Sequence, residues 1–140
     1  MRPGDHFLIG LYMLKNVKII ERAYNDSNKI TEKFNKNILR VINKELDADF
    51  NESLFEHHAF FNSEKNRIEM HLKAKQDMAV EIKALNLKID IEKEETINTE
   101  ISRKFKREET EKMFEKEGLS VERWLSDPNE WFSLAGMVKK

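Results

Sequence analysis

Residues 67–74 read Arg67-Ile68-Glu69-Met70-His71-Leu72-Lys73-Ala74, a strict alternation of polar and apolar side chains. Successive side chains on a β-strand point to opposite faces, so this period of two predicts a strand with one apolar face. The side chains on that face are Ile68, Met70, Leu72 and Ala74. Such a strand is typical of an antiparallel sheet that buries one face and leaves the other in water.

The same alternation continues on both sides of this segment. It begins near Leu54, where the period changes from 3.6 to 2, and it recurs in residues 78–82 and 85–91. Turn-forming residues at 62–66 and a break at 83–84 separate these runs. Together they predict an antiparallel meander.

Two helices are predicted before the strand region. Val17, Ile20 and Tyr24 are spaced three and four residues apart, which puts them on one side of a short helix. A second helix is predicted from about Lys29 to Leu46. The expected N-caps of this second helix are Asp26, Ser27 and Asn28. Its expected buried stripe consists of Phe34, Ile38, Val41, Ile42 and Leu46.

The two ends of the chain have a different character. The unbroken apolar run at residues 7–14 is typical of a strand buried on both faces in the middle of a parallel sheet. Nothing precedes this run to pair with it, so the chain is expected to begin in the middle of a fold. A helix of about a dozen residues is predicted after Phe105, followed by strands near 121–125 and 131–138. The sequence therefore predicts an α+β unit over residues 15–104, flanked by pieces of an α/β sheet.

The composition excludes several classes of protein. The 140 residues fit a single domain, and the 25 basic and 26 acidic side chains are interleaved, without the basic stripe of a nucleic-acid-binding protein. The chain has no cysteine, which excludes disulfide scaffolds and cysteine-based metal sites or nucleophiles. No apolar run approaches the ~20 residues of a membrane span. We expect a cytoplasmic protein with neither a nucleic-acid nor a membrane partner.

The segment 95–105 contains the pair of polar residues that points most clearly to a ligand. If it is extended, Glu100 and Ser102 share one face and Ile101 points the other way, with the two polar side chains roughly 6–7 Å apart. A carboxylate and a hydroxyl at that spacing can hold a small flat ring with two nitrogens, such as imidazole. Taken alone, however, a Glu-x-Ser pair more often marks a polar strand end that leads into a helix.

The histidines raise the question of a metal site. They are His6, His57, His58 and His71. On a strand, His57 and His58 would point to opposite faces and could not chelate one ion together. We therefore expect surface or half-buried histidines and no metal site.

Two further residues have a structural and a ligand-binding interpretation. Met70 lies on the apolar face of its predicted strand, which favours core packing. Tyr24 would also pack on its helix, although its hydroxyl could reach a ligand. From the residues alone, the chain is predicted to be a soluble α+β domain able to bind a small ligand.

Four segments in order resemble the histidine-specific S-adenosylmethionine-dependent methyltransferase family, whose best-known member trimethylates the α-amine of histidine in ergothioneine biosynthesis. They are Arg2-Pro3-Gly4-Asp5-His6-Phe7-Leu8-Ile9-Gly10, Ala23-Tyr24-Asn25-Asp26, Arg67-Ile68-Glu69-Met70 and Thr99-Glu100-Ile101-Ser102-Arg103-Lys104-Phe105. The end of the chain, with Gly118-Leu119, Trp124 and Asp127-Pro128, is similar as well. The resemblance covers essentially all 140 residues.

The resemblance implies that this chain is the C-terminal portion of a longer enzyme. Family members are about twice as long and have a Rossmann-like methyltransferase core whose glycine-rich cofactor turn would lie before Met1. Residues 1–14 and 105–140 would be the last strands and helix of that core, and residues 15–104 most of an inserted substrate-binding domain. S-adenosyl-L-methionine would be bound by the missing N-terminal portion, so this chain alone is expected to be inactive and to bind no cofactor.

The resemblance also implies roles for individual residues. Tyr24 corresponds to a tyrosine that binds the substrate carboxylate, Met70 to a residue beside the side-chain ring, and Glu100 and Ser102 to the pair that holds the imidazole nitrogens. The implied substrate is the α-amine of an amino acid, most specifically L-histidine. The alternative is a non-enzymatic amino-acid-binding module without a cofactor domain. Tyr12 stands where the family often has an acidic residue, and no residue of this chain is assigned a catalytic role.

Overall fold

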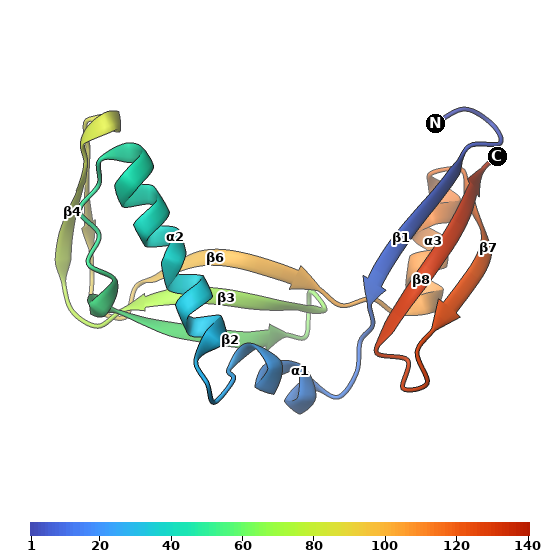
Figure 1. The fold of residues 1–140 in the computed structure, drawn as a ribbon, viewed down its shortest axis with the longest axis horizontal. Helices are drawn as coiled ribbons and strands as arrows, with labels where there is room; N and C mark the ends of the chain where they lie inside the picture. The colour runs from blue at the N-terminus through green and yellow to red at the C-terminus, as the bar shows by residue number, and fades with distance from the viewer. The chain divides into compact units, whose positions relative to one another are not determined.

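The computed structural model describes all of residues 1–140, and they form two compact units (Figure 1). Unit 1 comprises residues 1–17, 63–67 and 103–140, and unit 2 comprises residues 18–62 and 68–102. Three helices and eight antiparallel strands in three sheets make the chain an α+β protein, as the sequence predicted.

The strands of unit 2 form two separate sheets. β2 (Phe55–Asn62), β3 (Arg67–Ala74) and β6 (Thr96–Arg103) form one sheet with β3 in the middle, while β4 (Met78–Ile82) and β5 (Leu87–Ile91) form a hairpin of their own. The strand predicted at residues 67–74 is confirmed to the residue.

The prediction of one continuous meander is wrong. After β3 the chain leaves the sheet to make the β4–β5 hairpin, which turns through the short 3-10 helix η2 (Lys83–Leu85). It then returns to the other edge of β3 as β6. Two backbone hydrogen bonds fix this return, from Ala74 N–H to the Glu95 carbonyl (2.8 Å) and from Glu94 N–H to the Ala74 carbonyl (2.8 Å). Local periodicity fixes which residues are extended but not which strands pair, and here the pairing is between strands distant in sequence.

Both predicted helices are present, as α1 (Val17–Tyr24) and α2 (Ile30–Leu46). The carboxylate of Asp26 accepts hydrogen bonds from the N–H groups of Thr31 (2.8 Å) and Ile30 (2.9 Å), which would otherwise lack partners at the start of α2. The Asp26 carboxylate therefore stabilises this helix start, but the N-cap residue is Lys29, so the prediction of Asp26, Ser27 and Asn28 as N-caps is wrong. The bonds from Thr31 and then Ile30 lower the pKa of Asp26 to about 2.

This capping predicts an acid-dependent contribution to stability. A carboxylate whose pKa is lowered in the folded state stabilises that state above its ordinary pKa, and the contribution disappears as the pH falls through the folded value. We expect Asp26→Ala to lower the thermal unfolding midpoint at neutral pH. The gap to the unsubstituted protein should close as the pH falls from 3.8 toward about 2. Circular dichroism melts at a series of pH values test this, with the exposed neighbour Ser27→Ala as the control. A gap of constant size across that range would contradict the assignment.

The predicted buried stripe of α2 is wrong for three of its members. Phe34, Ile38 and Val41 are 64%, 40% and 43% exposed, whereas Asn35 and Leu39 are almost completely buried. Leu39 belongs to the core of unit 2, whose other buried members are Phe55, Leu72, Ala74, Val80, Ile82 and Ile91. The helix is therefore rotated from the orientation that its largest apolar residues suggest, because the buried face carries an asparagine that the sheet satisfies with hydrogen bonds.

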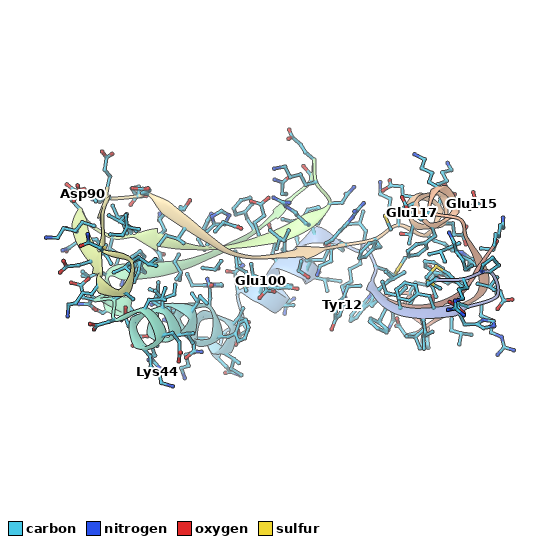
Figure 2. The ribbon with its side chains drawn as sticks, turned by 90° about the horizontal axis from the view of Figure 1, so that it is seen from above. Tyr12, Lys44, Asp90, Glu100, Glu115 and Glu117 are labelled. Carbon is cyan, nitrogen blue, oxygen red and sulfur yellow. The ribbon has the colours of Figure 1, made fainter.

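Unit 1 is a three-stranded sheet with α3 (Arg107–Lys116) on one face (Figure 2). Its strand order is β1 (His6–Tyr12), β8 (Phe132–Lys139), β7 (Leu119–Ser126), all antiparallel. The helix predicted after Phe105 and the two C-terminal strands are thus confirmed.

The assignment of residues 7–14 to a strand buried on both faces of a parallel sheet is wrong for this chain. β1 is an edge strand, antiparallel to β8, and only one of its faces is covered. Leu11 and Met13 are buried in the core with Phe114 of α3, whereas Leu8 and Tyr12 are 69% and 59% exposed. No helix of the structure is both long and apolar enough to cross a membrane.

Candidate functional site

A small pocket lies in unit 2 where α2 crosses β3 and β6. Its volume is about 190 Å³, which suits a ligand smaller than a drug-sized molecule. It is lined by Phe34, Asn35, Asn37, Ile38, Val41, Met70, Thr99 and Glu100. The exposed apolar residues of α2 therefore form one wall of the pocket, and two strands of the sheet form the other.

The pocket brings together two of the four residues that the sequence singled out. Met70, on the central strand β3, is 2% exposed, and Glu100 is half-buried on the edge strand β6. Figure 2 shows Glu100 on the side of β6 where α2 lies. Tyr24, the last residue of α1, and Ser102, two residues after Glu100, are also half-buried in unit 2 but do not line this pocket.

The expected extended conformation of the Glu100–Ser102 segment is confirmed, because β6 runs from Thr96 to Arg103. Within it Glu100 and Ser102 are half-buried and Ile101 is 52% exposed, as the alternation of a strand requires. The extended backbone that the prediction assumed is therefore present, and the action of Glu100 and Ser102 as a ring-binding pair stays a prediction.

The carboxylate of Glu100 has no hydrogen-bond or ion-pair partner in the chain. Other half-buried and buried carboxylates of unit 2 are engaged. Glu69, for example, accepts a hydrogen bond from Asn62 Nδ2 (3.0 Å) and lies 3.3 Å from His71 Nε2. A partly desolvated carboxylate without a partner is costly, and a ligand N–H would remove that cost. Glu100 is thus the group in this pocket most able to bind a donor from outside.

Sequence reasoning missed a buried polar residue that lines the pocket. Asn35 is 2% exposed, and its side-chain amide makes hydrogen bonds to β2, β3 and β6. The signal that could have found it is a second periodic row on the same helix, consisting of Asn35, Leu39, Ile42 and Leu46. An asparagine in that row indicates either that the row is not the buried face of the helix or that the asparagine is buried and makes hydrogen bonds.

Three of the four histidines lie on the neighbouring strands β2 and β3, and His6 lies on β1. His57 is half-buried and His58 is exposed, as expected for neighbours on a strand, and His71 stacks on Phe60 with ring centroids 5.4 Å apart. The structure contains no group of three or more His, Asp or Glu side chains arranged to hold a metal ion.

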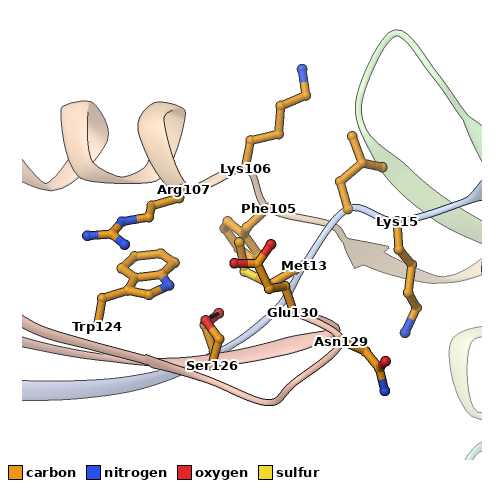
Figure 3. A pocket seen from close by; sticks show the side chains of 11 residues that line it. Met13, Lys15, Phe105, Lys106, Arg107, Trp124, Ser126, Asn129 and Glu130 are labelled. Atoms are coloured by element: carbon orange, nitrogen blue, oxygen red, sulfur yellow. Dashed lines mark hydrogen bonds between the residues drawn. The ribbon is translucent and has the colours of Figure 1, made fainter.

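A larger cavity of about 510 Å³ lies in unit 1, between the end of β1, the start of α3 and the β7–β8 turn (Figure 3). The Arg107 guanidinium lies over the Trp124 ring, 5.2 Å from its centroid, and also donates to Glu111 Oε1 (2.8 Å). Lys106 is likewise engaged, with Glu109 (2.8 Å). None of the predicted site residues lines this cavity, and its third cation, Lys15, lies over the Trp131 ring, 4.5 Å from the centroid. The unit 2 pocket therefore offers the clearer ligand chemistry.

Comparison with known proteins identifies the family of the chain. The family model for the histidine-specific, SAM-dependent methyltransferases matches residues 1–139. The chain belongs to this family. Two similar proteins are the histidine N-alpha-methyltransferases of Mycolicibacterium smegmatis (39% identical over 139 residues) and Mycobacterium tuberculosis (40% identical over 139 residues). In both comparisons 99% of this chain is aligned, and it spans 43% of the length of each relative.

Membership in the histidine-specific methyltransferase family confirms the resemblance that the four ordered segments indicated. The match spans residues 1–139 and therefore includes both the unit 2 pocket and the sheet of unit 1.

Proposed function

We propose that this chain is the C-terminal part of a SAM-dependent N-methyltransferase and carries the amino-acid pocket of that enzyme, with the α-amine of L-histidine as the methyl acceptor. The observation that carries the proposal is the unpartnered, half-buried carboxylate of Glu100 beside Met70. It lies in a chain that aligns over 99% of its length with histidine N-alpha-methyltransferases.

The four predicted site residues have complementary chemistry for histidine, and two of them, Met70 and Glu100, line the unit 2 pocket. The Glu100 carboxylate would accept a charge-assisted hydrogen bond from one imidazole N–H, and the Ser102 hydroxyl would serve the other ring nitrogen. Met70 would pack beside the ring, and the Tyr24 hydroxyl would donate to the substrate carboxylate. A ligand without ring nitrogens would leave Glu100 unpaired, which disfavours it.

The residues of this chain would contribute binding and orientation to the reaction. S-adenosylmethionine supplies an electrophilic methyl group on a sulfonium sulfur. Tyr24 at one end and Glu100 with Ser102 at the other would hold the amino acid so that its neutral amine meets that carbon in line. Positioning of this kind accounts for much of the acceleration of a two-substrate reaction.

The cofactor site is proposed to lie in the portion of the enzyme that precedes this chain. The four glycines of the chain, at positions 4, 10, 118 and 136, make no glycine-rich turn between a strand and a helix. The residues present therefore do not fit the cofactor by themselves.

Unit 1 is proposed to be the end of a Rossmann-like core, formed by residues 1–14 and 105–140, with residues 15–104 as the substrate-binding domain. Two features support this. The outer edge of β1 has no strand beside it, and one face of the sheet is apolar and exposed. The exposed residues of this face are Leu8, Tyr12, Leu125, Phe132 and Leu134. A sheet of this kind is stable when further strands and helices cover it.

Mass spectrometry of histidine incubated with S-adenosylmethionine and the full-length protein tests the activity. We expect successive gains of up to three methyl groups on the amine. Unchanged histidine would overturn the proposal. Titration calorimetry tests the location of the cofactor site, since micromolar binding of S-adenosylmethionine to the 140-residue chain alone would contradict it.

The alternative, a non-enzymatic amino-acid-binding module, is less well supported, since the relatives are enzymes. An open reading frame upstream of Met1 that encodes a domain with a glycine-rich turn would exclude it.

A further inference from the structure

Asn35 is a buried polar side chain whose hydrogen-bonding capacity is used by three strands. Its Nδ2 donates to the His71 carbonyl oxygen on β3 (3.0 Å) and lies 2.9 Å from His57 Nδ1 on β2. Its Oδ1 accepts from the Thr99 hydroxyl on β6 at 2.5 Å. Both amide protons therefore have acceptors, and the oxygen has a donor.

His57 extends these contacts to α1. Its Nε2 lies 2.8 Å from the carbonyl oxygen of Tyr24, which can only accept, so Nε2 carries the proton. In the neutral ring Nδ1 is then an acceptor, and Asn35 Nδ2 donates to it. The tautomer of His57 is fixed by its two partners.

The hydrogen bonds that Asn35 makes with His57, His71 and Thr99 form a network, and its ends lie at the proposed substrate-binding residues. Tyr24 supplies the carbonyl that His57 holds, His71 directly follows Met70, and Thr99 directly precedes Glu100. The Thr99 hydroxyl also lies 2.9 Å from the Met70 carbonyl oxygen. One buried amide is therefore connected, through a single intermediate group or none, to the backbone at each of these sites.

We propose that Asn35, acting through His57 and Thr99, is a positioning residue that sets the separation between Tyr24, the proposed carboxylate-binding residue, and the proposed ring-binding residues Met70 and Glu100. This inference rests on the proposed function. The polar atoms of Asn35 are occupied by the protein, so it acts on the substrate through Tyr24, Met70 and Glu100.

Physical reasons favour positioning over a purely structural role. A leucine at position 35 would fill a helix–sheet contact without the desolvation cost of an amide, so stability alone does not require an asparagine. Directional hydrogen bonds instead fix the register of α1, β3 and β6, and binding sites depend on positions held within fractions of an ångström.

The test uses steady-state kinetics of the full-length enzyme. Thr99→Val preserves the side-chain volume and introduces a residue that is also suited to a strand, but it removes the hydroxyl. Thr99→Ser keeps the hydroxyl. We expect Thr99→Val to raise KM for histidine by about tenfold, the effect of one hydrogen bond, with KM for S-adenosylmethionine unchanged. Thr99→Ser should stay close to the unsubstituted enzyme.

A second pair of variants separates positioning from direct contact, because His57 does not line the pocket. His57→Phe should raise KM for histidine, while His58→Phe, a change at the exposed neighbour, should not. Asn43→Ala is the matched control on α2, since Asn43 also makes two hydrogen bonds, to the backbone of Phe50, but none to the site. A variant that only reduces the folded fraction lowers apparent kcat without changing KM.

Three outcomes would overturn the inference: an unchanged KM in Thr99→Val, an equal loss in Thr99→Ser, or an equal rise in KM for Asn43→Ala. If the unsubstituted enzyme does not methylate histidine, the proposed function fails and the inference fails with it. If it does and the variants behave like their controls, only the positioning role is wrong.

Discussion

Glu100→Ala should lower kcat/KM for histidine by about 100-fold, the upper part of the range for a hydrogen bond to a charged group. Glu100 has no partner within the chain, so its removal costs the folded protein nothing in lost hydrogen bonds. The loss should appear only when the ligand is present. Steady-state kinetics of the full-length enzyme with histidine measures kcat/KM, and thermal unfolding without ligand measures the stability of the folded protein.

Two variants make this result interpretable. Glu81→Ala removes a half-buried strand glutamate of β4 whose side chain makes only a 3.8 Å ion pair with Lys88, and it should leave kcat/KM unchanged. Glu100→Gln keeps the shape of the side chain and a neutral acceptor, so its loss should be smaller than that of alanine. Equal losses of activity and stability in Glu100→Ala would mean that Glu100 supports the fold and does not bind the ring.

The sequence predicted the elements of this fold well because each has a local cause. Alternation over residues 67–74 and 78–82 predicted β3 and β4 within a residue, and the spacing of Val17, Ile20 and Tyr24 predicted α1. Strand pairing has no such local cause. The return of β6 to β3 and the antiparallel pairing of β1 with β8 are long-range choices that depend on the whole set of faces to be buried.

The residues of the candidate site that carry the resemblance to the family could be predicted from the sequence. The residues that only support them through hydrogen bonds could not. Glu100 and Met70 were singled out, and one pocket contains both. Asn35 and Thr99 were missed, because the polar atoms of a buried amide find their partners only after sheet and helix have packed. Where sequence patterning fails at a buried polar position, a functional reason is often the cause.

The error in the predicted buried stripe of α2 also occurs at the candidate site. Phe34, Ile38 and Val41 were predicted to be core because they are large, apolar and periodic. In the structure they are the exposed wall of the pocket, opposite Met70 and Glu100. An apolar row can thus be kept on a helix to shape a ligand site while a second row of the same helix packs on the sheet.

Phe55→Ala should be the most destabilising of the single substitutions considered, at about 3–5 kcal/mol of unfolding free energy. Phe55 is 0% exposed at the start of β2, in the core that joins the β4–β5 hairpin to the three-stranded sheet beneath Leu39. Truncation to alanine would leave a cavity between two sheets that cannot both move to fill it. Such a loss is a large share of the 5–15 kcal/mol that stabilises a typical domain.

Phe34→Ala is the matched substitution on the face of α2 that the sequence predicted to be buried. Because Phe34 is 64% exposed, the loss of its phenyl ring should change the unfolding free energy by less than about 0.5 kcal/mol. Urea denaturation of the 140-residue chain followed by far-UV circular dichroism measures both variants. Tryptophan fluorescence reports on unit 1 alone, since Trp124 and Trp131 both lie there. If Phe34→Ala were the more damaging change, α2 would present its large apolar row to the core, and neither the pocket wall nor the buried position of Asn35 could be correct.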